Sequence, residues 1–394
     1  AHILSGAVME PTALNELFPE WKEMGAPLIT PVTDDHIFVM TGAEKRIRVP
    51  GLFAPKTMHN QGNYVISLGK LCRWLAEQAE NLGVEVFPGF AAAEVLYGAD
   101  NQVLGIATGD MGVGHNGENK DSYMQGMELR AKYTFIAEGV RGSLTKMLFA
   151  KFNLRDGVEP QKFGIGLKEV WEIPADKHRK GLVVHTQGWP LSETKTGGGS
   201  FMYHFGDGLV SIGFVIHLNY KNPYISPFDE FQRFKTHPNI RWYFEGDEAK
   251  GIAPAKRISY GARAITAGGI LSLPKTVFPG GALIGCEAGY LNASRIKGSH
   301  AAIKTGMLAA EAAYGALQAG RQHDELTAYP EAFESSWLYT ELNKARNFKQ
   351  WFKKGRTVGT LMTGVEQFLL RGHVPWTIRR TAADHTYLKP ASEC

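Results

Sequence analysis

The chain has 394 residues, of which 44% are hydrophobic and 21% are charged, so it is long enough for two or three packed domains and too apolar to be disordered. Its formal net charge of +4 is spread along the sequence, which argues against a dedicated nucleic-acid-binding protein. The 45 glycines exceed average usage and fit a protein whose backbone approaches a ligand closely.

The first clear unit, residues 63–96, has the pattern of a piece of an α/β layer. A short apolar run at 64–68 leads into apolar residues at helical spacing up to Ala79. Gly83 supplies a helix stop, and the residues after it predict a strand at 84–87. The chain then predicts two further strands, at 90–96 and 103–108.

A polar, glycine-rich segment follows at 109–126. Its run GVGHNG at residues 112–117 formally matches the dinucleotide-binding pattern G-x-G-x-x-G. That pattern works only between a strand and a helix, because the pyrophosphate binds the N–H groups of the helix N-terminus. Here turn-forming residues follow, so we interpret the segment as a hairpin loop.

A strand predicted at 129–137 ends in the run EGVRGS at residues 138–143, and a helix is predicted at 144–152. Several flavoprotein families bring the chain past FAD at such a joint. Strand–turn–helix joints that contain glycine are also common without any ligand, so this motif alone is weak. From 164 to 220 the pattern changes to alternating strands, which predicts a second domain built on an antiparallel sheet and inserted at this point.

Residues 282–317 return to a strand, a glycine loop and a helix that begins near Gly298 and Ser299. The positive end of this helix would favour the negative charge that develops on a reduced flavin. The alternative is an alanine-rich packing helix. His300 is a possible proton donor, but a capping or packing role is preferred, and Cys286 is preferred as a small buried apolar residue.

The last sixty residues predict basic helices, and residues 357–370 carry an apolar stripe that includes Leu361, Met362 and Phe368. Basic residues flank this segment and Trp376 follows it, which favours shallow insertion among anionic headgroups. A helix packed on the core would show the same stripe. A second membrane-contacting candidate is a hairpin at 37–53, with Phe38, Leu52 and Phe53.

Three cysteines, Cys72, Cys286 and Cys394, lie far apart and form no C-x-x-C pair, so neither a disulfide framework nor a cluster motif is visible. This usage suits a reducing compartment. No stretch reaches the ~18 apolar residues that cross a bilayer, so any membrane contact is expected from one side. The chain begins Ala-His-Ile without a leader and stops in polar coil, so we expect both ends to be cuts in a longer sequence.

Many short stretches together give the sequence a family resemblance: it resembles the electron transfer flavoprotein–ubiquinone oxidoreductases over essentially its whole length. The stretches are SGA at 5–7, LFPEWK at 17–22, GAP at 25–27, NQGNY at 60–64, GWP at 188–190, GGSF at 198–201, NPY at 222–224, EFQR at 230–233, YGARA at 260–264, LPK at 273–275, FPGG at 278–281, IGC at 284–286 and RIKG at 295–298.

The resemblance implies an α/β fold with mixed α+β character: a Rossmann-like FAD-binding domain of the glutathione-reductase type, an inserted antiparallel-sheet quinone-binding domain and a C-terminal helical segment on the membrane surface. The implied limits are 1–36, 54–150 and 256–325 for the FAD-binding domain, 37–53 for the membrane hairpin, 151–255 for the quinone-binding domain and 326–394 for the helical segment, with the membrane helix near 355–371. The family's own G-x-G-x-x-G would precede Ala1.

The resemblance also implies site residues. FAD contacts are expected at Ser5, Gly6, Glu138, Gly139, Gly285, Cys286, Glu287, Gly289, Gly298, Ser299 and Ala302. Ubiquinone is expected at the backbone of Gly198 and Gly199, for which a hairpin turn is the alternative. Membrane contacts are expected at Phe38, Leu52, Phe53, Leu361, Met362, Phe368 and Trp376. No catalytic side chain and no metal ligand is expected, because the cofactor carries the chemistry.

The activity implied is electron transfer from reduced electron transfer flavoprotein, through a 4Fe–4S cluster and FAD, to ubiquinone. The cluster ligands would lie outside this chain, which by itself is expected to be inactive. The implied location is monotopic on an inner membrane, on the mitochondrial matrix side or the bacterial cytoplasmic side. The alternatives are a geranylgeranyl-reductase-like flavoenzyme and a non-catalytic membrane-docking homologue.

Overall fold

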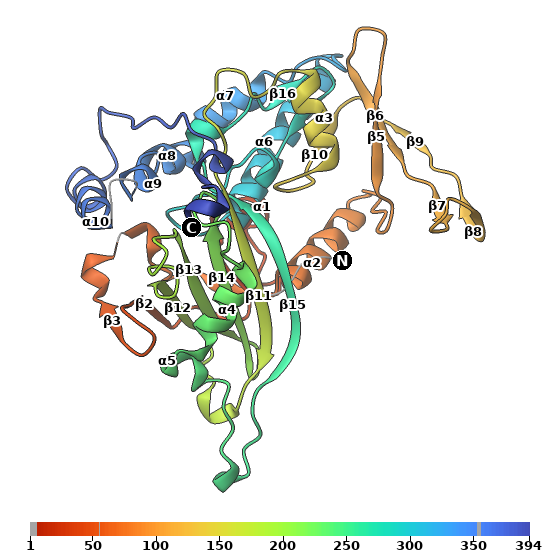
Figure 1. Cartoon of the computed structure of the whole chain (residues 1–394). Coiled ribbons are helices and arrows are strands. Elements are labelled where there is room, and N and C mark those ends of the chain that lie inside the picture. Colours follow the sequence, from red (N-terminus) through yellow and green to blue (C-terminus); the bar gives the residue numbers. More distant parts are fainter. Residues whose placement is uncertain (1–5, 55, 353–355) are drawn as a thin grey trace.

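The computed structural model describes residues 6–54, 56–352 and 356–394, and its centre is a seven-stranded sheet (Figure 1). Neighbouring strands are antiparallel except β12 and β2, which are parallel. In order across the sheet the strands are β15 (Lys256–Thr266), β11 (Phe163–Glu172), β14 (Leu209–His217), β13 (Gly198–Phe205), β12 (Leu182–Gly188), β2 (Asp34–Met40) and β3 (Arg46–Val49).

Side chains alternate between the two faces along each strand, so both faces of the sheet carry side chains that can pack. One face packs Val183 and Tyr203 against Val8 and Val65 of the short strands β1 (Ala7–Met9) and β4 (Tyr64–Ile66). Elsewhere, Phe214 of the sheet packs on Phe231 and Phe234. Phe231 and Phe234 belong to helix α4 (Pro227–Thr236), which is followed in the chain by α5 (Pro238–Arg241).

A second unit is built around a three-stranded sheet of β10 (Thr134–Ile136), β17 (Gly281–Leu283) and β16 (Val277–Phe278), in which β10 and β17 are parallel. Its core buries Leu148, Ala282, Leu308 and Tyr329. The helices of this unit and its neighbours are α1 (Thr12–Leu17), α2 (Leu68–Asn81), α3 (Ser143–Lys151), α6 (Ser299–Gln318), α7 (Ala328–Glu334) and α8 (Trp337–Lys344). The mixed α/β architecture with an inserted antiparallel sheet is therefore confirmed.

An arm of short strands extends to one side of the molecule (Figure 1). Its strands are β5 (Ala92–Tyr97), β6 (Val103–Thr108), β7 (Met111–Val113), β8 (Asn119–Met124) and β9 (Glu128–Arg130). The run GVGHNG lies at the β7–β8 turn, where the Gly114 N–H donates to the Glu118 carbonyl at 2.7 Å. Gly112 and Gly117 have positive φ angles of 68° and 85°. The hairpin interpretation of this glycine run is confirmed.

Two predicted strands differ from the structure. Residues 84–87 form no strand, and Val84 and Phe87 are 54% and 56% exposed. The apolar side chains of this segment give the sequence pattern of a buried strand, but the segment is not paired with any described strand. The strand predicted at 129–137 is two strands, because β9 pairs with β6 while β10 pairs with β17 in another sheet. A continuous apolar run does not reveal such a change of partner.

The sheet also crosses two of the expected domain limits. The hairpin at 37–53 is not separate, since β2 pairs with β12 along its whole length. The limit placed between 255 and 256 falls at the start of β15, which pairs with β11 in the same sheet. The sequence did not indicate the pairing of β2 with β12 or of β15 with β11, because these strands are far apart in the chain and become neighbours only on folding.

The C-terminal part contains α9 (Phe348–Trp351), α10 (Arg356–Gly364) and a π-helical turn at Val365–Leu369. The helix predicted at 357–370 is confirmed. Glu366 on this segment is buried and accepts hydrogen bonds from Asn347 Nδ2 at 3.0 Å and from Trp376 Nε1 at 2.6 Å. Among the described helices, none has the length and apolar character needed to cross a bilayer.

Candidate flavin and quinone site

The strongest candidate site is the junction between β17 and α6, where a glycine loop meets a helix N-terminus. Gly285 has a φ of +63°, and its N–H donates to Thr305 Oγ1 at 3.0 Å. A Cβ atom at Gly285 would lie 3.4 Å from the Cβ of Ala302. The small residues therefore bring the loop close to α6, as the sequence indicated. Gly298 is the N-cap of α6, and no side chain caps the first N–H groups, beginning at Ser299.

Glu138 lies beside this junction and acts as the cap of α3. Its carboxylate accepts hydrogen bonds from the backbone N–H groups of Ser143, Leu144 and Thr145 at 3.2, 3.3 and 2.9 Å. A carboxylate at a helix N-terminus satisfies these donors and favours the helix dipole. Gly139 has a φ of +85° and open space where a Cβ would point. The Glu138 carboxylate is therefore engaged by the N-terminus of α3, and the FAD contacts expected at Glu138 and Gly139 stay predictions.

Glu287 connects the two segments, since its carboxyl accepts a hydrogen bond from Thr145 Oγ1. The side chain is buried, and its Oε2 has no hydrogen-bond partner in the described structure. Burial, and then the nearby charge of Glu138, raise the pKa of Glu287 to about 8. Glu287 therefore holds a proton at neutral pH. Burial also raises the pKa of the Cys286 thiol, which fits its expected role as a small apolar residue.

The remaining expected FAD contacts lie at close backbone contacts. Gly289 has a φ of +101°, and a Cβ there would meet Gln161 at 2.6 Å. Gly6 has a φ of +86°, and its carbonyl accepts from Lys168 Nζ at 3.2 Å and Ser211 Oγ at 3.3 Å. Gly6 thus joins β1 to the large sheet. Ser5 lies outside the described residues.

These features fit a flavin. The backbone is free of side chains at Gly139 and Gly285, so a flat ring can approach it. Polar groups are available at the uncapped helix N-terminus at Gly298 and at the carboxyl oxygen of Glu287 that has no hydrogen-bond partner in the described structure. Thr145 was missed from the sequence, although a hydroxyl two residues into a capped helix was a usable signal.

Gly198 and Gly199 lie in β13 and not in a turn, so the turn alternative is wrong. A Cβ at Gly198 would lie 2.1 Å from the Val215 carbonyl oxygen, and one at Gly199 would lie 2.6 Å from that of Thr186. The sheet itself therefore requires glycine at both positions. Whether their backbone also serves a quinone remains a prediction.

A basic pair lies next to these glycines. A Cβ at Gly197 would meet His217 Nδ1 at 2.6 Å, and the Nε2 of His217 lies 3.3 Å from Lys349 Nζ. Burial of the amino group, and then the charge of Lys162, lower the pKa of Lys349 to about 7. Lys349 is one of the basic residues that precede the 357–370 segment and were interpreted as flanks of a membrane helix, whereas in the structure it contacts His217. No local pattern signals the contact, because 132 residues separate the two side chains.

The expected membrane residues differ in exposure. Leu361 is 66% exposed, Phe368 40%, Trp376 38% and Leu52 82%. Met362 is half-buried. Phe38 is buried, with the centre of the Arg46 guanidinium 4.1 Å from its ring, so it is not exposed at the outer surface as a membrane contact was expected to be. The side chain of Phe53 lies outside the described part of the chain.

One group of side chains, Glu10, His300 and Glu341, has ligand atoms close enough for a metal ion among the described residues. Arg295 pairs with Glu10 and also lies 3.1 Å from Glu341. This guanidinium supplies the positive charge that a metal would supply. His300 is fully buried, stacks on Trp337 and lies 3.0 Å from Glu341, which supports its packing role.

Comparison with known proteins locates the chain in a family. A family model described as "ETF-QO, ubiquinone-binding" matches residues 163–265, which cover β11 to β15. Two solved structures share the fold at low identity. They are a geranylgeranyl bacteriochlorophyll reductase-like protein from Thermoplasma acidophilum (15% identity, TM-score 0.63, 98% of this chain and 80% of that one) and a flavin-dependent brominase (16% identity, TM-score 0.58, 93% and 81%).

Named relatives match over the whole chain. The electron transfer flavoprotein-ubiquinone oxidoreductase of Pseudomonas aeruginosa is 56% identical over 100% of this chain, which spans 70% of that protein. The mitochondrial proteins of Dictyostelium discoideum and Homo sapiens are 49% and 47% identical, and the chain spans 65% and 64% of their lengths. The sequence and the fold agree with these matches, and the chain belongs to the electron transfer flavoprotein–ubiquinone oxidoreductase family.

Proposed function

We propose that this chain forms the FAD- and ubiquinone-binding part of an enzyme that passes electrons from reduced electron transfer flavoprotein to ubiquinone at a membrane surface. The observation that carries the proposal is the 56% identity with the Pseudomonas aeruginosa relative over the entire chain. The ubiquinone-binding family model supports it independently, because it covers the part of the large sheet that contains Gly198 and Gly199.

FAD, when bound, supplies the redox chemistry, and the chain's residues position it and set its electrostatic environment. The uncapped N-terminus of α6 would stabilise negative charge on the reduced ring. Gly139 and Gly285 would let the backbone contact the ring without a side chain between them. Glu287, protonated at neutral pH, would donate a hydrogen bond there without adding a second negative charge.

For ubiquinone we propose the backbone beside Gly198 and Gly199, since a quinone offers carbonyl acceptors and an apolar ring. A glycine has no side chain that would stand between its backbone and the ring. The basic pair of His217 and Lys349 lies at the same end of β13 and would give this region a polar boundary.

The finer parts of the proposal concern the iron–sulfur cluster, the partner and the membrane. The cysteines of this chain do not fit a 4Fe–4S cluster: Cys72 and Cys394 are exposed, and Cys286 is half-buried in the flavin loop. We place the cluster ligands in the part of the longer relatives that this chain does not match. Leu52, Leu361 and Phe368 are the proposed membrane contacts of a monotopic protein on an inner membrane.

The experiment that tests the proposal is the visible absorption spectrum of the purified full-length protein, before and after addition of reduced electron transfer flavoprotein. A flavin band with a broad iron–sulfur shoulder that bleaches on reduction and recovers on addition of ubiquinone would support it. A colourless protein that cannot be reconstituted with FAD would overturn it. A flavin that is reduced but is not reoxidised by ubiquinone would overturn the quinone part alone.

A further inference from the structure

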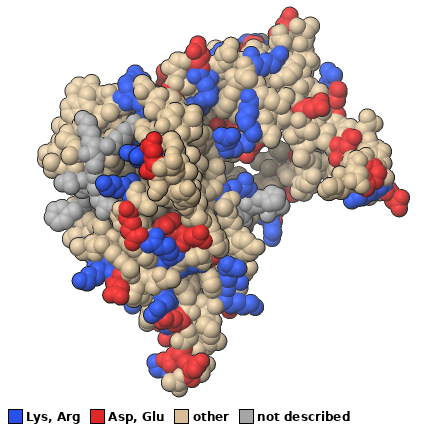
Figure 2. All heavy atoms as spheres, viewed as in Figure 1, with Lys and Arg blue, Asp and Glu red and all other residues tan. Residues whose placement is uncertain are grey.

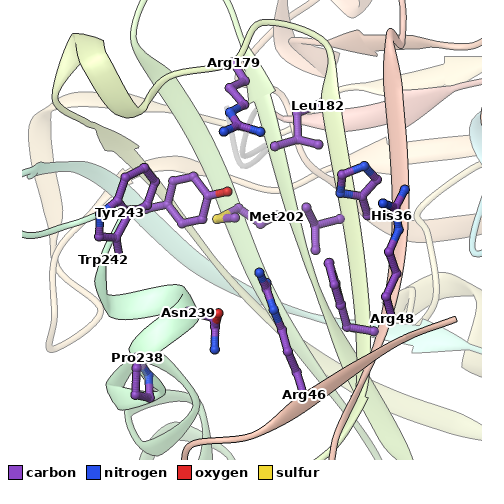
Figure 3. A pocket seen from close by; sticks show the side chains of 12 residues that line it. His36, Arg46, Arg48, Arg179, Leu182, Met202, Pro238, Asn239, Trp242 and Tyr243 are labelled. Atoms are coloured by element: carbon purple, nitrogen blue, oxygen red, sulfur yellow. The ribbon is translucent and has the colours of Figure 1, made fainter.

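A cavity of about 580 Å³ lies between β2, β3, β12 and β13 on one side and the α5 region on the other (Figure 3). Its floor is formed by the apolar side chains of Phe38, Leu182, Val184 and Met202, each at most 6% exposed. These residues belong to a cluster different from the one that packs the sheet on Val8 and Val65. Val183 and Tyr203, which alternate with them along the strands, take the other face. The cavity is therefore on the face of the sheet away from β1 and β4.

Three arginines surround this floor (Figure 3). Arg46 and Arg48 are two residues apart on β3, so both side chains take the same face of the strand, and Arg179 enters from the segment before β12. The guanidinium carbon of Arg46 lies 4.1 Å from the centroid of the Phe38 ring, a cation–π contact that does not use the N–H donors of the guanidinium. Ile47, between the two arginines, is 61% exposed on the opposite face.

The positive charge is not neutralised within the cavity wall. In the described ranges, no ion pair or side-chain hydrogen bond involves the guanidinium of Arg46, Arg48 or Arg179. The acidic groups nearby are Asp34 and Asp35, which act on His36, and Glu44, which acts on His237. Burial, and then the charge of Arg48, lower the pKa of His36, whereas Asp34 and Asp35 raise it.

The remaining wall is aromatic. Trp242 and Tyr243 pack edge to face at 4.9 Å, and Trp242 is 44% exposed. Asn239, on α5, adds an amide near them. An apolar floor, an aromatic wall and a rim of unpaired arginines are complementary to a molecule that carries an anionic phosphate on an apolar body.

We infer that this cavity binds the phosphate headgroup region of one anionic phospholipid, with the phosphate on Arg46, Arg48 and Arg179 and the first apolar carbons on the floor. The cavity volume of about 580 Å³ is of the size that receives a small amphiphile. The chain that leaves β3 also exposes Leu52, a proposed membrane contact, at 82%. The site goes beyond quinone reduction, which does not require it.

Calorimetric titration of the full-length protein with dihexanoylphosphatidylglycerol, below its micelle concentration, tests this site. Dihexanoylphosphatidylcholine is the zwitterionic comparison, and glycerol 3-phosphate separates a soluble phosphate from a lipid. We expect binding of the anionic lipid, with affinity reduced about tenfold or more by Arg46→Gln/Arg48→Gln. Asn239→Trp, which keeps every arginine and narrows the cavity from α5, should weaken binding similarly.

The matched control is Lys120→Gln/Arg130→Gln, which removes two positive charges from β8 and β9 on the distant arm and should leave binding unchanged (Figure 1). Equal affinity for glycerol 3-phosphate, lost in the same variants, would support a phosphate site filled from solution. No binding, or binding retained by both cavity variants, would overturn the inference. If Arg46→Gln/Arg48→Gln does not fold, the lipid affinities of Arg179→Gln and Asn239→Trp test the inference in its place. Unchanged quinone reduction in these variants separates this site from the proposed enzymatic function.

Discussion

At the residue scale, Glu287 shows how a buried acidic group can be held neutral. Its pKa of about 8, against 4.5 for an ordinary glutamate, means that the unfolded chain releases this proton at lower pH than the folded protein does. The free energy of unfolding therefore falls as the pH rises from 4.5 towards 8. The sequence predicted Glu287 as a site residue, but its protonation state depends on burial and then on the charge of Glu138, which is distant in the chain.

Glu287→Gln keeps the shape of the side chain and cannot ionise, so it should remove this pH dependence. We expect the stability difference between the variant and the wild type to shift in favour of the variant by on the order of 1 to 3 kcal/mol between about pH 5 and pH 8. Urea unfolding of the FAD-loaded protein at several pH values measures it. Parallel pH profiles for the two proteins would contradict a protonated Glu287.

Gly199 permits a second test at the same scale. Gly199→Ala places a Cβ near the Thr186 carbonyl oxygen at 2.6 Å, so the local backbone of β13 must shift. Because quinone contact is proposed at this backbone, we expect quinone reduction to slow by roughly tenfold or more while FAD stays bound.

Gly164→Ala is the matched control for Gly199→Ala, since it crowds another carbonyl of the same sheet, that of Ile216, at 3.2 Å. The control should lose stability without a comparable loss of quinone turnover. If each variant loses quinone turnover in proportion to the decrease in its melting temperature, Gly199 has only a packing role.

At the scale of elements, the C-terminal helical segment at 357–370 has one side packed on the protein and one side exposed to solvent. Its buried side is held by Glu366, which accepts from Asn347 and Trp376, while Leu361 and Phe368 face outward. The periodicity of 357–370 predicted the helix, but it left open which residues pack on the core. The structure resolves this because a buried carboxylate needs hydrogen-bond donors, and they come only from neighbouring segments.

Leu361→Glu/Phe368→Glu should therefore release the full-length protein from membranes with little loss of stability, because these side chains are 66% and 40% exposed. Loss of two apolar contacts with lipid should reduce vesicle binding by about tenfold or more. Vesicle co-sedimentation measures this. Leu82→Glu/Leu129→Glu, at positions that are 79% and 42% exposed elsewhere, is the control. Undiminished sedimentation of the first variant would exclude this helix as an anchor.

At the scale of the whole molecule, the large sheet joins the C-terminal region to the rest of the chain. The Phe163 N–H donates to Asp384 at 2.6 Å, and Arg380 donates to the Gln161 carbonyl at 3.1 Å. Lys349 also contacts His217 across this interface. Charges of both signs are interspersed on the outer surface in Figure 2, whereas this interface encloses several basic groups. Its stability should therefore depend on pH.

Lys349 titrates near pH 7 in the folded protein and near 10.5 in the unfolded chain. Between these values the unfolded chain binds a proton that the folded protein does not, so this residue destabilises the protein increasingly as the pH falls from 10.5 to 7. Lys349→Met should stabilise the protein by on the order of 1 to 3 kcal/mol at neutral pH and by much less above about pH 10. A pH-independent difference in unfolding free energy would contradict this.

The sequence by itself determined the family, the change from an α/β pattern to an antiparallel sheet and back, the hairpin at 112–117 and the glycine junctions at Gly139, Gly285 and Gly298. These depend on local spacing, on the conformations that glycine permits and on runs of residues shared with relatives. The tertiary structure alone decided that β2 and β15 belong to one sheet, that Phe38 is buried, that Lys349 meets His217 and that Arg46, Arg48 and Arg179 share a cavity. Those facts depend on segments far apart in the chain, whose strand pairing and burial arise only when the whole molecule packs.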